Sequence, residues 1–344
     1  MSTDHWIRIE ALFTAALEQP VGARSAFVAT HCVGDDSLRR EVEALLDATD
    51  SAGELRGAIA RKLRDLSDEH GAGRLGQRVA GYRLVRVLGA GGMGVVYLAT
   101  RDRGAAVAIK ILAATATSTH ALARFRDEQE ILAELEHPHI VRLLGAGHVE
   151  DGSPYLLMEY VDGLPITDHV SQFVTPLRGR LALTRAICGA LSHAHQRDIV
   201  HRDLKPSNLL IDRTGAPRIV DFGIAKQRAA LVRHARTPTG QILGTPAYMA
   251  PEQCRGEPSD DPRIDVYAIG CVLFHLIAGR PPFVGATTGD MLADHLLAPP
   301  PPPSTVAPEI SPALDELVLR CLAKLPDHRF ATMTELTAAL AALL

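Results

Sequence analysis

The sequence lacks any apolar stretch that could cross a membrane, because nowhere do about 18 apolar residues follow one another. Its N-terminal string, MSTDHWIRIE, also lacks the basic start and the long apolar segment of a signal peptide. These absences argue against a secreted or membrane-spanning protein. We therefore expect a cytoplasmic location without direct membrane insertion.

Basic charge and paired cysteines are also scarce. A net charge of -4 leaves no basic excess to attract nucleic acid, so we expect no nucleic-acid partner. The 5 cysteines contain no C-x-x-C pair, and they are Cys32, Cys188, Cys254, Cys271 and Cys321. This odd, scattered set favours reduced thiols over a disulfide framework or a zinc site.

The patterns that are present divide the chain into three regions. A single core stops growing at roughly 250 to 300 residues, so a chain of 344 residues predicts more than one domain. Residues 1–70 carry apolar side chains at helical spacing and predict a small helical module. The Gly-rich residues 71–81 predict a linker, and residues 82–344 form the main region.

The main region changes character near Asp162. The runs YRLVRVL, GVVYLAT and AAVAIKIL predict strands, and a long helix is predicted from about Thr119 to Glu136. More strands are predicted around 140–144 and 155–160, and helical periodicity dominates beyond them. This predicts an α+β fold with a small antiparallel β lobe (82–161) that includes one long helix, and a large mainly helical lobe (162–344).

A glycine-rich motif joins the first two predicted strands. Gly89, Gly91 and Gly94 have the spacing G-x-G-x-x-G, which dinucleotide-binding folds place between a strand and a helix. A strand follows here, so the glycines predict a hairpin whose amides can face phosphate oxygens. A glycine-rich turn without a ligand stays an alternative for this motif alone.

Lys110 ends the third predicted strand, where its ammonium can reach the same phosphates. Glu128, on the predicted helix, is the carboxylate that we expect to hold Lys110. Asp127 and Glu130 are neighbours with claims of their own, and an isolated surface lysine and glutamate is the alternative.

The most specific strings are HRDLKPSN at 201–208 and DFG at 221–223. With them, residues 82–344 resemble the eukaryotic-type protein kinase family in its bacterial serine/threonine branch, which implies a two-lobed protein kinase fold. The resemblance implies that Asp203 accepts the proton of the substrate hydroxyl. Lys205 would neutralise charge on the phosphoryl group, while Lys110 and Glu128 complete the catalytic set.

The resemblance also implies ATP and Mg²⁺ or Mn²⁺, with Asn208 and Asp221 as the metal ligands. The glycine hairpin would cover the phosphates with Gly89, Ala90, Gly91, Gly92, Met93 and Gly94. An apolar slot would hold the adenine and is formed by Leu88, Val96, Ala108, Met158, Leu210 and Val220. Glu159 and Val161 would offer backbone hydrogen bonds to the purine. Apolar strand residues belong to a core in any case, so that alternative stays open for the slot.

Other strings resemble the scaffold of the family. GTPAYMAPE at 244–252 is similar to the end of an activation segment, in which Glu252 would pair with Arg329. Asp265 would brace the catalytic loop. A spine between the lobes would contain Leu132, Leu143, His201 and Phe222.

Substrate preference and activation are also implied. Lys205-Pro206-Ser207 and Gly244-Thr245 are typical of the serine/threonine branch, so we expect protein substrates with Ser or Thr acceptors. Thr237 and Thr239 are candidate autophosphorylation sites whose phosphate would dock on Arg202. A homodimer would serve such a reaction in trans. Ordinary loop threonines are the alternative.

Two other functions are weighed against this one. A small-molecule phosphotransferase would lack the segment 244–252, and a nucleotide-binding pseudokinase scaffold would be expected to lose Lys110, Asp203 or Asp221. The chain retains all of them. For the N-terminal helices, regulation or partner docking and a simple packing role stay equally open.

Overall fold

The computed structural model describes residues 24–32, 39, 73–91, 94–102, 104–112, 135–222, 246–257, 259–285 and 287–344. The chain divides into two compact units, Met1–Gly73 and Arg74–Leu344. In the first unit, helix α2 (Arg24–His31) buries Val28 and packs the ring of Phe27 against that of His31, with ring centroids 4.1 Å apart. The other helical residues predicted before residue 73 lie outside the described part, apart from Arg39, which is helical.

The second unit begins with a sheet of six antiparallel strands in the order β1-β2-β3-β4-β6-β5. The strands are β1 (Arg78–Val79), β2 (Tyr82–Gly91), β3 (Gly94–Thr100), β4 (Val107–Leu112), β5 (Leu143–His148) and β6 (Pro154–Glu159). Alternate residues such as Leu84, Tyr97 and Ile109 share one face and form a buried cluster. Strand β1 lies inside the residues predicted as a linker.

The fifth strand differs from its prediction. The run at 140–144 was predicted as a strand, yet β5 begins only at Leu143. Ile140 instead forms an isolated parallel bridge with Ile219, in the helical lobe. The predicted long helix falls mostly on residues 113–134, outside the described part, and Leu135 and Glu136 at its expected end are not helical.

The larger lobe contains mostly helices and a small sheet that the sequence patterns did not predict. Strands β7 (Gly163–Pro165), β8 (Leu209–Asp212) and β9 (Pro217–Ile219) pair in that order. The helices are α5 (Ile166–Gln172), α6 (Leu177–His195), α8 (Pro251–Cys254), α9 (Arg263–Ala278), α10 (Thr288–Leu297), α11 (Pro312–Cys321) and α12 (Met333–Ala341).

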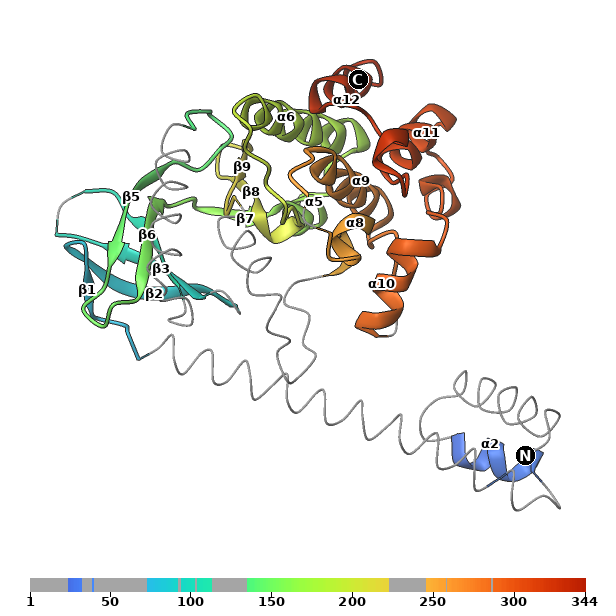
Figure 1. Cartoon of the computed structure of the whole chain (residues 1–344), viewed down its shortest axis with the longest axis horizontal. Coiled ribbons are helices and arrows are strands. Elements are labelled where there is room, and N and C mark those ends of the chain that lie inside the picture. Colours follow the sequence, from blue (N-terminus) through green and yellow to red (C-terminus); the bar gives the residue numbers. More distant parts are fainter. Residues whose placement is uncertain are drawn as a thin grey trace. The chain divides into compact units, whose positions relative to one another are not determined.

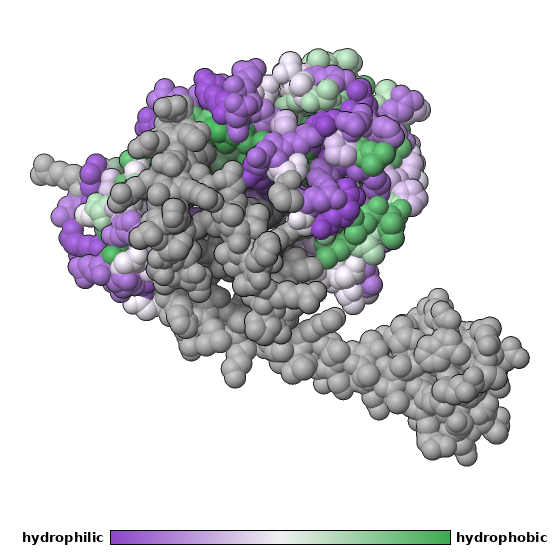
Figure 2. All heavy atoms as spheres, viewed as in Figure 1, coloured by the Kyte–Doolittle hydropathy of each residue, from purple (hydrophilic) through white to green (hydrophobic). Residues whose placement is uncertain are grey.

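Helix α9 is the centre of this lobe. Its buried residues occur on all sides of the helix, as in a helix that other elements surround. Figure 1 shows α9 with α6, α8 and α11 around it. On the face seen in Figure 2, hydrophilic residues predominate, and hydrophobic areas are small. None of the helices in the described residues is long and apolar enough to span a membrane.

A buried histidine on α10 predicts a pH dependence of stability. His295 is fully buried beside Tyr267, whose hydroxyl oxygen lies at hydrogen-bond distance from His295 Nδ1, 2.8 Å away. Burial, and then the charge of Lys324, lowers the His295 pKa to about 4 from 6.5. The unfolded chain therefore binds this proton more tightly. The stabilisation is complete above about pH 6.5 and is lost as the pH falls toward about 4.

We expect His295→Gln, whose amide can still form a hydrogen bond with Tyr267, to remove roughly 3 kcal/mol of this acid destabilisation. Urea unfolding at a series of pH values measures it. The exposed His328→Gln serves as the matched control. A pH profile of stability that is the same in His295→Gln and in the unmodified chain contradicts the assignment.

Candidate active site

The glycine motif forms the predicted hairpin between β2 and β3. Gly89 pairs with Val96 and Gly91 with Gly94, while Gly92 and Met93 lie outside the described residues. Gly94 has φ of 140°, and a Cβ at this position would lie 2.1 Å from the Ile111 carbonyl oxygen. Only glycine fits here, because any side chain would collide with strand β4.

Lys110 lies on β4 directly opposite Val96, so both side chains emerge on one face of the sheet. Its Nζ lies 2.8 Å from Asp221 Oδ2, across the boundary between the lobes. Asp221 adopts φ of 58°, which is uncommon for a residue with a side chain. Glu128, Asp127 and Glu130 lie outside the described residues, so the predicted pairing of Lys110 with Glu128 stays a prediction.

The segment between α6 and β8, which we call the catalytic loop (201–208), brings three more predicted residues together. Lys205 Nζ lies 2.9 Å from Asp203 Oδ2. Asn208 Nδ2 donates to the Asp203 carbonyl at 2.8 Å. The backbone amide of Val220 donates to the Asn208 carbonyl at 3.0 Å. These contacts connect Asp203, through Asn208, to the residue that precedes Asp221.

Asp265 on α9 braces this loop, as expected. Its Oδ2 accepts hydrogen bonds from the His201 amide and from His195 Nε2, and its Oδ1 accepts from the Arg202 amide, all at 2.8 Å. Burial alone would raise the pKa of Asp265, but these hydrogen bonds and the nearby histidines lower it on balance. A charged carboxylate in the core therefore fixes the backbone beside Asp203.

His201 connects the loop to the DFG segment. Its Nε2 lies 3.1 Å from the Val220 carbonyl, and its ring lies 4.7 Å from the ring of Phe222. Burial lowers the His201 pKa despite the nearby carboxylates, so the ring is a neutral donor to Val220. Leu132, the fourth residue of the expected spine, lies outside the described part.

The adenine-slot residues come from both lobes. Ala108 pairs with Met158 across β4 and β6, and Ala108 shares its strand face with Lys110. Leu210 lies on β8, and Val220 follows β9. Leu88 is exposed and Val96 half-buried. The amide of Glu159 donates to the Arg142 carbonyl at 3.0 Å, so the predicted backbone bond from Glu159 to a purine would involve its carbonyl.

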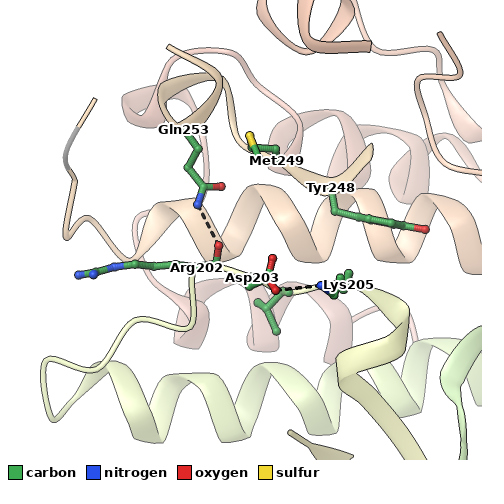
Figure 3. A pocket seen from close by; sticks show the side chains of 7 residues that line it. Arg202, Asp203, Lys205, Tyr248, Met249 and Gln253 are labelled. Carbon is green, nitrogen blue, oxygen red and sulfur yellow. Dashed lines mark hydrogen bonds and ion pairs between the residues drawn. The ribbon is translucent and has the colours of Figure 1, made fainter. Parts of the chain in front are cut away.

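A small pocket opens at Asp203. It is lined by Arg202, Asp203, Leu204, Lys205, Tyr248, Met249 and Gln253. Figure 3 shows Tyr248 and Met249 across from Asp203 and Lys205, and Gln253 reaching back to the loop. Gln253 Nε2 donates to the Arg202 carbonyl at 2.9 Å. Sequence reasoning missed Gln253, although its place directly after Glu252 was a signal.

The profile of the protein kinase domain family matches residues 82–340. The chain belongs to the protein kinase family. The serine/threonine-protein kinase PknB of Mycolicibacterium smegmatis is 40% identical over 268 residues, which cover 75% of this chain and 42% of PknB. The serine/threonine-protein kinase Pkn1 of Myxococcus xanthus is 43% identical over 267 residues, covering 75% of this chain and 38% of Pkn1. The chain thus spans about two fifths of the length of these relatives.

The fold agrees with this membership. A crystal structure of the Mycobacterium tuberculosis PknI kinase domain superposes with a TM-score of 0.61 at 34% sequence identity. The match covers 78% of this chain and 97% of that kinase domain. The predicted two-lobed protein kinase fold is therefore confirmed, and protein kinases generally use ATP and Mg²⁺.

Proposed function

We propose that this chain is a serine/threonine protein kinase that transfers the γ-phosphate of ATP to Ser or Thr hydroxyls of proteins. One observation carries the proposal. The predicted catalytic and metal-binding residues form one linked set. Lys110 forms an ion pair with Asp221, and the preceding Val220 donates a hydrogen bond to Asn208. Asp203 accepts a hydrogen bond from Asn208 and forms an ion pair with Lys205. Phosphoryl transfer needs positioned charge more than covalent chemistry, and this linked set supplies it.

In this mechanism Asp203 orients the substrate hydroxyl and accepts its proton. Lys205, held at 2.9 Å from Asp203, neutralises charge on the phosphoryl group. Lys110 is poised to hold the phosphates under the glycine hairpin. The Asp221 carboxylate and the Asn208 amide oxygen are hard donors that fit Mg²⁺, which when bound would neutralise phosphate oxygens. Asn208 can offer its amide oxygen to the metal because its Nδ2 already donates to the Asp203 carbonyl.

The proposal is tested with radiolabelled ATP and a generic basic protein that offers Ser and Thr acceptors. We expect label on both the substrate and the chain itself, on Ser and Thr alone. Nucleotide binding without transfer would favour the pseudokinase scaffold. Transfer to a small molecule but not to protein would favour the phosphotransferase.

Removal of the metal should abolish this activity. The metal ligands that we propose, Asn208 and Asp221, are oxygen donors suited to Mg²⁺ or Mn²⁺. We expect excess chelator to stop transfer, and added Mg²⁺ or Mn²⁺ to restore it. Full activity after exhaustive chelation would overturn the assignment of both ligands.

We propose that Thr237 and Thr239, outside the described residues, are autophosphorylated and that their phosphate docks on Arg202. A phosphate adds roughly -1.5 to -2 charge and strong acceptors for an arginine. We expect mass spectrometry to find phosphate there after incubation with ATP. Activity should fall in the double variant Thr237→Ala/Thr239→Ala. Undiminished activity would refute activation by phosphorylation of these threonines. If the reaction occurs in trans within a homodimer, a catalytically dead copy should be labelled by an active one.

We propose the domain division 1–70 (helical module), 71–81 (linker) and 82–344 (kinase domain), and a cytoplasmic location. Fractionation of cells tests the location.

The helical module (1–70) would regulate the kinase or bind a partner. If deletion of residues 1–75 leaves activity and oligomeric state unchanged, the module has a packing role only.

A further inference from the structure

Arg202, the residue before Asp203, is held from three directions. Its amide donates to Asp265 Oδ1 at 2.8 Å, and its carbonyl accepts from Gln253 Nε2 at 2.9 Å. Its guanidinium forms an ion pair with the carboxylate of Asp260. The Arg202 side chain is only 13% exposed, whereas that of Asp260 is 88% exposed. A surface carboxylate thus forms an ion pair with an arginine of the catalytic loop, next to Asp203.

The backbone of Arg202 needs such support. Its φ is 64°, in the left-handed region. This conformation is unfavourable for any residue with a side chain. Asp203 follows immediately, so the conformation of Arg202 sets the direction of the catalytic carboxylate. Contacts that hold Arg202 therefore act on Asp203 without touching a substrate.

The loop that carries Asp260 is itself anchored. The next residue, Asp261, accepts from Arg263 Nε at 3.0 and 2.9 Å and from Arg263 Nη2 at 2.7 Å. Arg263 also contacts Asp327 at 2.6 Å. Of two consecutive carboxylates, Asp261 thus ties the loop to the start of α9, and Asp260 faces Arg202.

We propose that Asp260 is a positioning residue that supplies Arg202 with a negative partner before any phosphate is present. This inference rests on the proposed kinase function. The Asp260 carboxylate pairs with the Arg202 guanidinium as a phosphate group would, but it brings one negative charge and fewer acceptor oxygens. Asp260 thus supports a basal activity that does not depend on phosphorylation. A phosphothreonine of higher charge would displace it.

The size of the effect follows from the exposure of the pair. Exposed ion pairs change an equilibrium by roughly two- to fivefold, and salt screens them. We therefore expect Asp260→Asn to lower the turnover of the unphosphorylated kinase by roughly two- to fivefold at low ionic strength. The loss should shrink at high ionic strength, which a purely structural defect would not do.

The experiment compares Asp260→Asn with Asp260→Glu in the full chain, each in the Thr237→Ala/Thr239→Ala background and in the autophosphorylated form. We expect the loss for Asn only, and only without phosphate. Asp327→Asn is the matched control, because Asp327 is 87% exposed and pairs with Arg263, which lies outside the catalytic loop. Arg263 would keep its ion pair with Asp261 in this variant.

Three results would overturn the inference alone. The first is equal turnover of Asp260→Asn and the parent in the unphosphorylated background. The second is no turnover in that background even with Asp260, and the third is an equal loss in both phosphorylation states. Absence of transfer by the unmodified chain would instead overturn the proposed function, and the inference with it.

Discussion

Asp203→Asn should lower the rate of phosphotransfer by a factor of about 10² to 10⁴. Asparagine keeps the shape of the side chain, and the carbonyl of residue 203 can still accept from Asn208 Nδ2. What disappears is the group that takes the proton of the substrate hydroxyl, together with the partner of the Lys205 ammonium. Turnover with saturating ATP and protein substrate measures the loss.

The same assay on Lys110→Met tests the other end of the linked set. We expect a comparable loss, because methionine keeps most of the unbranched apolar stem but has no ammonium to bind phosphate or to pair with Asp221. Thermal unfolding serves as the control, and both variants should remain folded. More than about a tenth of the original turnover in either variant would disprove the role given to that residue.

Arg329→Met should destabilise the kinase domain by about 3 to 5 kcal/mol. Arg329 pairs through both terminal nitrogens with Glu252, at 2.7 and 2.8 Å, and the two side chains are 0% and 5% exposed. It also donates to the carbonyls of Ala323, Arg263 and Lys324. Without the guanidinium, Glu252 is a buried charge without its partner, which explains the cost.

Urea unfolding of Arg329→Met, Glu252→Gln and the double variant separates these effects. The double variant should lose less stability than the sum of the single changes, since no unpaired charge remains. Arg320→Met removes an arginine from a half-exposed pair with Glu335 and is the matched control, with an expected loss below about 1 kcal/mol. A loss of that small size for Arg329→Met would contradict the buried-pair argument.

Local patterns in the sequence were sufficient for much of this architecture. The glycines and the β-branched runs around Gly94 predicted a hairpin, and the strings at 201–208 and 221–223 predicted neighbours of Asp203 and Asp221. These features depend on residues close together in the chain or on resemblance to a family. The buried pair of Glu252 and Arg329 and the brace at Asp265 were also expected from the resemblance.

Contacts between distant segments could not be predicted in the same way. Strands β7 to β9 are short, with little room for a periodic pattern, and Ile140 pairs with Ile219 in the other lobe. Nothing local distinguishes Asp260 from Asp261, although Asp260 pairs with Arg202 and Asp261 pairs with Arg263. The partner of Lys110 on the predicted long helix, Glu128, stays a prediction.

The bridge at Ile140 has a mechanical consequence. Val141 donates to the Ile219 carbonyl at 2.9 Å, and Ile219 donates to the His139 carbonyl at 2.8 Å, directly before β5. The chain itself crosses between the lobes just after β6, which is the neighbour of β5. Both connections lie at one edge of the sheet and together define a pivot. The hairpin of β2 and β3 lies three to four strands away, roughly 15 to 20 Å. A small rotation about this pivot would therefore displace the hairpin of β2 and β3 more than it displaces β5 and β6.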